Sequence, residues 1–410
     1  MSQYPLIPQT MYGSVLESNK TVPWDKFRDE RMKKLRGLIN ERGLDGLLLN
    51  RWENIRYITD FRRFFSIYTG AFFAALLPKN ADPVLLIHAG DLQSAKLTMP
   101  WIKDIRLLPA IGRPDIYKKA LDDYGIDKGR IGLDWMPFQH YEALRKAAPS
   151  ATFLDEDTHI AETRAVKLPE EIRLMYDAVK ICEITVRACL DAIKPGIREY
   201  EVAAIGERAG RMEGAEYFSW EFCPISGYNA GMFIRMCTDK RMEDGDLVIV
   251  GNGIIYHGYN ADVTVTTICG KPTEKQKKMY KTTQETMEAA TRAIKPGVMT
   301  GDLHKMAADI IRKAGYDEYS FRHFHPLEHG IGLNVYEPPF SPEPEKDVPS
   351  MELKAGHTLC PEPSILCYKD PSVGGVKREH SPCYRHRCQE AIKRSARRTR
   401  QTYGRMMMNR

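Results

Sequence analysis

The spacing of apolar residues predicts alternating helices and strands along the first third of the chain. In residues 24–50, apolar positions recur at helical spacing up to Gly43 and then give way to the run LLL. This pattern predicts an amphipathic helix that ends near Gly43, followed by a buried strand. Three further apolar runs have the length of short strands and lie at residues 54–61, 71–77 and 83–88. Helical and extended stretches continue to about residue 157, so we expect an α/β domain.

A charged segment, TRAVKLPEEIRLMYDA, opens a second region of the chain. Pro169 stands where a helix could begin, and two glutamates follow it in the first turn, where the helix dipole favours acidic side chains. We place the boundary near residue 162. The prediction is therefore an N-terminal domain of residues 20–161 and a second domain of residues 162–380.

The second region contains an internal repeat. The pentapeptide AIKPG occurs within residues 188–205 and again within residues 289–308, each time with helical patterns on both sides. Proline cannot continue a helix and glycine permits the turn that follows, so the motif marks a helix end. Two matches with the same flanks indicate a duplicated α/β unit. Facing halves of this kind leave a cleft between their sheets, where ligands commonly bind.

The composition is that of a soluble globular protein, with 43% hydrophobic and 28% charged residues in a chain of 410. The N-terminus, MSQYPLIPQT, lacks the pattern of a secretory signal, and the apolar patch YTGAFFAALLP is shorter than a membrane span. The nine cysteines form no CxxC pairs, which is typical of reduced thiols. We therefore expect a cytoplasmic protein with no membrane partner.

The net charge of +6 comes from the C-terminal tail. Residues 381–410 contain nine Lys and Arg residues and one Glu, so the rest of the chain carries 51 basic and 53 acidic residues. A body with a net charge of −2 gives no indication of nucleic-acid binding. Two hypotheses account for the tail: a shifted reading frame that begins near residue 381, or a genuine basic appendage that is disordered or touches nucleic acid.

Four residues that could carry chemistry stand at or near strand-like runs: Asp262, His329, Glu362 and Glu379. Three carboxylates and one imidazole suit a divalent ion such as Mn, Fe, Co or Zn. Each residue also has a structural interpretation. Asp262 could be a turn acid, His329 a hydrogen-bonded loop residue, Glu362 a surface turn between prolines, and Glu379 a partner of the adjacent basic residues.

The order of several motifs resembles the pita-bread family, which comprises creatinase, Xaa-Pro aminopeptidase and prolidase, with methionine aminopeptidase more distant. The matching segments lie within residues 24–380 and are NIRYITDF, GDLVIVGNGIIYHGYNADVTVTTICGKPT, HPLEHGIGLNVYEPPF, LKAGHTLCPEPSIL and GGVKREH. The resemblance implies a creatinase-like α/β domain followed by a pseudo-twofold catalytic domain. It also implies a homodimer.

Hydrolytic members of that family hold two metal ions with two Asp, one His and two Glu. The resemblance carries four of these ligands onto this chain: Asp262, His329, Glu362 and Glu379. The first Asp falls at Gly251, which offers no side chain, and the neighbouring Asn252 should point to the other face of the strand. The family pattern therefore implies a reduced site that holds one divalent ion, and metal-free chemistry stays open.

Three further positions depart from the family pattern. Residues 160–256 contain no histidine, and Ile234 stands near the place of the family's upstream catalytic His. Tyr336 replaces the second His that follows the GHGIG motif, and Val265 replaces the usual Arg. His325 is kept and could contact substrate or form a structural hydrogen bond. A phenol can donate a hydrogen bond but is a poor proton shuttle near neutral pH.

These features together predict a metal-dependent hydrolase that acts on a peptide or on a small substrate with a C–N bond. Glu362 is the candidate general base, and His325 and Tyr336 are candidate contacts to substrate or oxyanion. Two alternatives remain. The first is a non-peptidase branch, either a creatinase-like amidinohydrolase or a lyase of the dimethylsulfoniopropionate type. The second is a catalytically inactive binding module of the same fold.

Overall fold

The computed structural model describes residues 22–62, 73–109, 113–220, 222–232, 235–341, 349–369, 373–377 and 379–380. For residues 379 and 380 it describes the backbone only. Their contacts divide the chain into two compact units between Arg164 and Ala165. We refer to the described residues up to 164 as the N-terminal unit and to those from 165 as the C-terminal unit. The tail beginning at residue 381, with its two hypotheses, lies outside the described residues.

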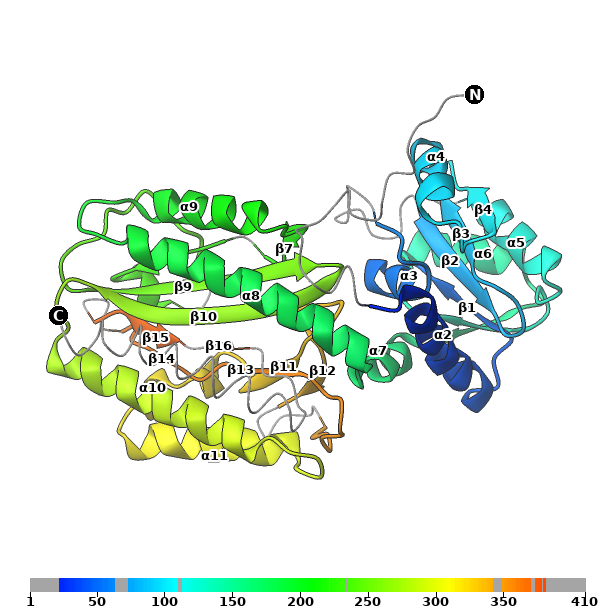
Figure 1. Cartoon of the computed structure of the whole chain (residues 1–410). Helices are drawn as coiled ribbons and strands as arrows, with labels where there is room; N and C mark the ends of the chain where they lie inside the picture. The colour runs from blue at the N-terminus through cyan, green and yellow to red at the C-terminus, as the bar shows by residue number, and fades with distance from the viewer. Residues whose placement is uncertain are drawn as a thin grey trace. The chain divides into compact units, whose positions relative to one another are not determined.

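The N-terminal unit is a six-stranded mixed sheet with helices packed on it (Figure 1). The strand order is β4-β3-β2-β1-β5-β6, and the central β1 pairs antiparallel with β2 and parallel with β5. The strands are β1 Gly46–Leu49, β2 Phe73–Pro78, β3 Val84–Ile87, β4 Asp104–Leu107, β5 Arg130–Leu133 and β6 Thr152–Asp155. The helices are α2 Trp24–Glu41, α3 Trp52–Thr59, α4 Ala89–Thr98, α5 Pro114–Asp123, α6 Phe138–Ala147 and α7 Asp157–Ala165. The predicted α/β domain is confirmed.

The first predicted helix and strand are also confirmed. Helix α2 ends at Glu41, and Gly43 follows with a φ of 61°, a left-handed conformation that glycine adopts without strain. Strand β1 is buried along its whole length. The apolar runs at 71–77 and 83–88 contribute β2 and β3, with residues 71 and 72 outside the described part.

The prediction of a strand at residues 54–61 is wrong, because this segment forms most of α3. Every residue of α3 after the first is buried. A helix that is buried on all sides shows no amphipathic period, so a short apolar run does not reveal which element it forms. The helix ends at Asp60, which has a φ of 58° and pairs with Arg28 and Arg31 of α2.

The C-terminal unit repeats a pair of helices, as the AIKPG motifs predict. The first pair is α8 Pro169–Ala192 and α9 Glu199–Met212; the second pair is α10 Glu274–Ala293 and α11 Thr300–Lys313. Each motif contains the end of one helix and the turn to the next. Gly196 and Gly297 occupy the same place in the two turns, with φ values of 91° and 85°. This backbone region favours glycine, which explains why both repeats retain it.

A long hairpin lies between the two helix pairs (Figure 1). Strands β9 Asp246–Tyr256 and β10 Tyr259–Cys269 pair antiparallel over their whole length. His257 and Gly258 form the turn, and both have positive φ, as a two-residue turn of type I′ requires. Helix α8 packs on both strands. The hairpin therefore presents one face to α8 and the opposite face toward the second half of the unit.

Short strands complete the C-terminal unit. They are β7 Tyr217–Phe218, β8 Ile225–Ser226, β11 Glu328–Gly330, β12 Glu337–Phe340, β13 Leu359–Pro361, β14 Ser364–Leu366, β15 Gly375–Lys377 and β16 Glu379–His380. Three 3₁₀ turns are η2 Asn229–Gly231, η3 Asp317–Tyr319 and η4 Phe321–His323. The sheets are ordered β16-β10-β9-β7, with β8 also on β9, then β12-β11-β13, and β14-β15. Segments that are distant in the chain, such as β15 and β16, therefore lie beside the long hairpin.

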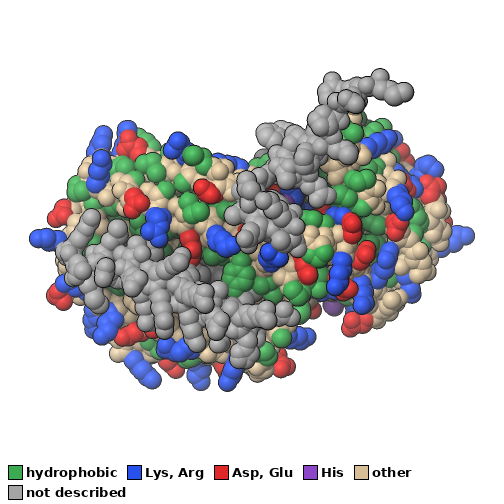
Figure 2. Space-filling model, viewed as in Figure 1, with side chains coloured by type: hydrophobic (Ala, Val, Ile, Leu, Met, Phe, Trp, Pro, Cys, Tyr) green, Lys and Arg blue, Asp and Glu red, His purple; other side chains and the backbone are tan. Residues whose placement is uncertain are grey.

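The visible face carries basic and acidic side chains interspersed over both units (Figure 2). This distribution agrees with the near-neutral charge of the body. Among the described helices, none combines the length and the apolar composition needed to cross a bilayer.

Candidate metal centre

Four buried side chains of the C-terminal unit converge on one point. They are Asp262, His329, Cys360 and Glu362, and one potential ligand atom from each lies within 4.8 Å of all the others. Each of these residues is at most 2% exposed. The cluster contains three of the four residues that the sequence nominates as metal ligands. Its fourth member is a thiol that sequence reasoning missed.

Three strands position these residues. Asp262 lies within β10, and His329 lies within β11 directly opposite Cys360 of β13. Glu362 follows the last residue of β13, and its backbone N–H donates to the carbonyl of Leu327 at 2.7 Å. The backbone hydrogen bonds thus place these four residues beside one another. These positions exclude a turn role for Asp262, a loop role for His329 and a surface role for Glu362.

The ring of His329 is oriented for ligation through Nε2. Its Nδ1 lies 2.9 Å from the carbonyl oxygen of Gly330, an acceptor that holds the proton on Nδ1. Nε2 then faces the cluster, 2.6 Å from Glu362 Oε1 and 3.7 Å from Asp262 Oδ2. Burial by itself would lower the pKa of His329, but the carboxylates of Glu362 and Asp262 raise that pKa well above its ordinary value. The imidazole therefore lies in a strongly negative environment, which also favours a bound cation.

Glu362 is held by basic groups on its other side. Lys377 Nζ lies 3.4 Å from Glu362 Oε2, and His325 Nδ1 lies 3.8 Å from the same oxygen. Burial opposes ionisation of Glu362, but Lys377 and then His329 lower its pKa below the ordinary range. Glu362 is therefore an ionised carboxylate at neutral pH.

His325 is a neutral, fixed histidine. Its Nδ1 lies 2.7 Å from the carbonyl of Pro326, and its Nε2 lies 3.2 Å from Ser364 Oγ. Burial lowers the pKa of His325 to about 4, because the attraction of Glu362 does not offset the loss of solvent. The ring therefore lies beside Glu362 and carries no charge at neutral pH.

Tyr336 lies at the outer edge of the cluster. Its ring centroid is 4.2 Å from that of His329, at an interplanar angle of 46°. The residue is 52% exposed, so one side of the ring covers His329 and the other side faces solvent. Tyr336 therefore lies beside a nominated ligand and remains accessible to solvent.

Gly251 shares a strand face with the cluster but contributes no ligand. It pairs with Thr264, two residues along β10 from Asp262, and an added Cβ would lie 2.7 Å from Thr264 Oγ1. Asn252 points toward α8 instead, where its Oδ1 accepts from Cys182 Sγ at 3.0 Å. A side chain at position 251 would therefore extend toward the cluster, as the family pattern implies, whereas Asn252 cannot.

The other nominated positions have different outcomes. The backbone of Glu379 lies in β16 and pairs with Thr264, which places residue 379 beside the same stretch of β10; its side chain lies outside the described part. Val265 is buried opposite Val250. Ile234 lies outside the described residues.

Two residues near the cluster were missed from the sequence. Cys360 stands two positions before Glu362, so both could have been assigned to one face of an extended segment. Lys377 stands two positions before Glu379 and could have been treated in the same way. Neither signal is specific, because only the pairing of β11 with β13 and of β14 with β15 brings these side chains to Glu362.

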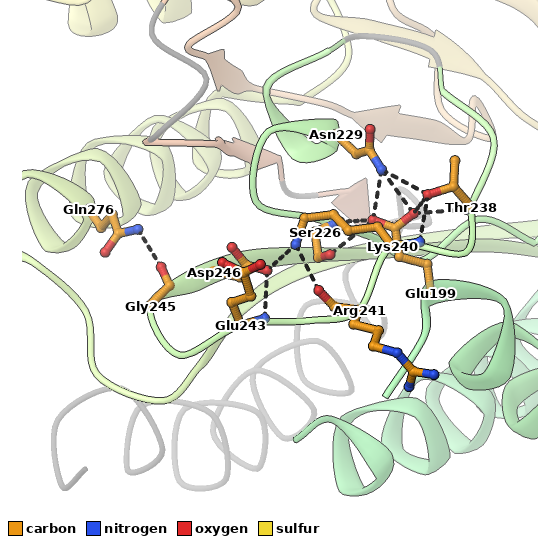
Figure 3. A network of polar contacts seen from close by, with 10 residues as sticks. All are labelled: Glu199, Ser226, Asn229, Thr238, Lys240, Arg241, Glu243, Gly245, Asp246 and Gln276. Carbon is orange, nitrogen blue, oxygen red and sulfur yellow. Dashed lines mark hydrogen bonds and ion pairs between the residues drawn. The ribbon is translucent and has the colours of Figure 1, made fainter. Parts of the chain in front are cut away.

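A second buried carboxylate fixes a loop of the same unit (Figure 3). Glu199, at the start of α9, accepts hydrogen bonds from the backbone and hydroxyl of Ser226 at 2.7 and 2.9 Å. It accepts equivalent bonds from Thr238 at 2.8 and 2.9 Å, and Asn229 Nδ2 lies 3.0 Å from both its oxygens. One carboxylate thereby ties two separate stretches of the loop before β9 to a helix.

The donor set of the cluster fits a divalent metal ion. An ion bound at about 2.0–2.3 Å requires ligand atoms no more than about 4.6 Å apart, close to the spacing of this group. The cluster offers an imidazole nitrogen whose other nitrogen is already hydrogen bonded, together with the carboxyl groups of Asp262 and Glu362. Both features are typical of protein metal sites.

Comparisons with known proteins agree with the fold and with the use of a divalent metal. The model of metallopeptidase family M24 matches residues 173–382, and the model of the creatinase/prolidase N-terminal domain matches residues 31–166. An Xaa-Pro dipeptidase of Pyrococcus horikoshii is 31% identical over 355 residues, which cover 86% of this chain and 93% of that protein. An Xaa-Pro dipeptidase of Pyrococcus furiosus is 29% identical over 358 residues, with 85% and 93% covered.

Solved structures show the same relationship. The crystal structure of the prolidase from Pyrococcus horikoshii OT3 has a TM-score of 0.74 at 30% identity and covers 86% of this chain and 94% of that one. The Xaa-Pro dipeptidase from Bacillus anthracis has a TM-score of 0.76 at 25% identity, with 88% and 96% covered. The fold and the buried cluster together define a metallohydrolase with the pita-bread fold. The chain belongs to metallopeptidase family M24, which confirms the resemblance drawn from its motifs.

Proposed function

We propose that this protein is a metal-dependent peptidase that hydrolyses Xaa-Pro dipeptides at a site holding a single divalent ion. The observation that carries the proposal is the buried convergence of Asp262, His329 and Glu362. Two relatives that match most of the chain are Xaa-Pro dipeptidases, which supports the substrate class. The absence of a side chain at Gly251 supports one ion instead of two.

Four residues would hold the ion: Asp262, His329, Glu362 and Glu379. Support for the first three comes from their spacing, and support for Glu379 comes from the pairing of its backbone with β10. Mn, Co, Zn and Fe all suit a set of carboxylates and one imidazole. When bound, a metal of this kind lowers the pKa of water and polarises the substrate carbonyl.

The neighbouring side chains would bind and orient the substrate. Glu362 is ionised and can accept a proton from the attacking water as a general base. His325 is neutral and held by two hydrogen bonds, so it presents a fixed edge to the substrate. Tyr336 can donate its hydroxyl proton in a hydrogen bond to the oxygen on which negative charge develops. The ring of Tyr336 also limits the access of water to His329.

Metal content and dipeptide hydrolysis measured on the same samples test this proposal. The protein is purified with Mn, Co, Zn or Fe supplied, and bound metal is determined by elemental mass spectrometry. About one equivalent per chain is expected from the loss of the first Asp. His329→Ala should lose both the metal and the activity. His323→Ala, an exposed histidine six positions earlier, is the matched control and should retain both.

A different result would overturn part of the proposal or all of it. Two equivalents would contradict the single-ion site, whereas metal without dipeptide hydrolysis would contradict the substrate class. Complete absence of metal in the wild type would contradict the metal-dependent mechanism.

A metal-free function is the second candidate. The observation that favours it is the ammonium of Lys377, which lies 3.4 Å from Glu362 Oε2 and supplies a positive charge to the cluster. In this case the site would act on a small C–N substrate, as a creatinase-like amidinohydrolase, or would only bind a ligand. Activity on small amidino compounds that survives chelation and dialysis would favour this candidate. A lyase of the dimethylsulfoniopropionate type would instead require the metal.

We propose that the protein acts in the cytoplasm as a homodimer. Seven cysteines of the described residues are thiols, which suits a reducing compartment. The dimer is supported by the family resemblance. Light scattering coupled to gel filtration would test it, and a monomer at micromolar concentration would contradict it.

A further inference from the structure

Cys360 is the member of the cluster that the family pattern does not include. Its side chain has 0% exposure and belongs to β13. The antiparallel register places it directly opposite His329. Its sulfur lies 3.9 Å from the backbone carbonyl of Asp262, so it is directed at β10 and not away from the site. The thiol thus contacts the strands that carry two nominated ligands.

The position of this sulfur is compatible with direct coordination. All four potential ligand atoms lie within 4.8 Å of one another, which is within a few tenths of an ångström of the span around one ion. A Zn–S bond of about 2.3 Å and a Zn–N bond of about 2.0 Å put these two donor atoms no more than about 4.3 Å apart, close to the spacing in the cluster. The described side chains offer one nitrogen, one sulfur and two carboxylates, and Glu379 would add a third carboxylate to this set.

We propose that Cys360 supplies a thiolate ligand to the metal ion, in addition to Asp262, His329, Glu362 and Glu379. The inference rests on the proposed metal-dependent function of this site. Strand β13 would thus provide a metal ligand, whereas β9 provides none at position 251 because the residue there is glycine. On binding, the thiol S–H bond is replaced by a sulfur–metal bond and the proton passes to solvent, so metal uptake releases a proton from Cys360.

A sulfur ligand changes which metal the site selects. Thiolate favours Zn, Fe and Co over Mn, whereas a site built only from carboxylates and imidazole is compatible with Mn. The wild type should therefore prefer Zn or Co to Mn in direct competition. Cys360→Ser should shift this preference toward Mn and should lower zinc affinity by more than about tenfold.

Cobalt spectroscopy on the full chain tests the ligand directly. The metal-free protein is titrated with Co(II), and the absorption is recorded in the near ultraviolet, where thiolate-to-cobalt charge transfer appears. The wild type should develop this band in step with one bound cobalt. Cys360→Ser should lose the band, whereas Cys367→Ser should keep it. Cys367 is the matched control, because it is equally buried but follows β14 and lies against Met279 of helix α10.

X-ray absorption of the zinc-loaded wild type gives a second measurement that does not depend on a variant folding. One sulfur scatterer at about 2.3 Å is expected. Stoichiometric metal with only oxygen and nitrogen neighbours and no charge-transfer band would overturn the thiolate ligand while leaving the proposed function intact. If neither cobalt nor zinc binds the wild type, the proposed function fails, and the thiolate ligand fails with it.

Discussion

Replacing Glu199 by Gln should loosen the loop before β9 by an amount that can be worked out from its contacts. The carboxylate of Glu199 is fully buried, and its two oxygens accept backbone N–H groups from Ser226 and Thr238 at 2.7 and 2.8 Å (Figure 3). Gln keeps one acceptor and turns the other into an N–H donor. That donor must face either Ser226 or Thr238.

The hydroxyls of both residues can rotate and become acceptors, but a backbone N–H cannot. One buried N–H is therefore left without an acceptor, which costs about 1–3 kcal/mol, and the charge-assisted character of the remaining bonds is lost as well. We expect a total of about 2–4 kcal/mol, which is equivalent to about a 30- to 700-fold change in the local opening equilibrium. Glu199→Ala removes both acceptors and should have a larger effect.

Hydrogen exchange read by mass spectrometry is the appropriate assay, because it reports local opening within a chain of two units. Peptides that contain Ser226 or Thr238 should exchange faster in Glu199→Gln. In at least one of these peptides, the increase in the exchange rate should fall within the range of about 30- to 700-fold. Glu207→Gln, an exposed glutamate on the same helix, is the control and should change stability by less than about 0.5 kcal/mol. If neither peptide changes by more than about threefold, Glu199 is not the acceptor that holds this loop.

The remaining predictions concern the gap in the site and the response to acid. Gly251→Asp should raise bound metal from about one to about two equivalents; it should also destabilise the fold by about 1–3 kcal/mol, because the new Cβ meets Thr264 Oγ1 at 2.7 Å. Adding Thr264→Ala should recover stability in urea unfolding, and an unchanged metal content would contradict the placement of position 251. In the N-terminal unit, burial opposes ionisation of Asp60, but Arg31 and Arg28 lower its pKa below the ordinary 3.8. The folded chain then binds fewer protons than the unfolded chain, so this stabilisation is present above pH 3.8 and is lost as the pH falls through the folded-state pKa. Asp60→Asn should flatten the acid limb of the stability curve, and an unchanged limb would refute the pairing.

Regular patterns made much of the fold predictable. Helix α2 has an apolar period and a stop at Gly43, and both AIKPG turns contain the proline and glycine that a helix end requires. The segment at 54–61 failed because α3 is buried on all sides, so the information that distinguishes helix from strand is absent from its polarity. Packing against the rest of the fold, and not the local pattern of polarity, determines that this segment is a helix.

The candidate site was predictable only where a motif identified it. Asp262, His329 and Glu362 converge as the family pattern implies. Cys360 lies within the segment LKAGHTLCPEPSIL, but the family pattern gives it no role, and its place beside the ligands depends on the register between β11 and β13. Lys377 likewise reaches Glu362 through the pairing of β14 and β15. Contacts of this kind join distant parts of the chain, and no local window of sequence contains them.

The same register has a consequence for the order of events during folding. Asp262 and Cys360 are separated by 98 positions in the chain, so the cluster closes only after a long loop has been ordered. Contacts between distant segments form slowly and late. The apolar core that packs α10 and α11 against the short strands contains none of these ligands and can assemble without a cation. The ligand cluster therefore depends on contacts between distant segments, whereas the apolar core beneath it is built from other residues.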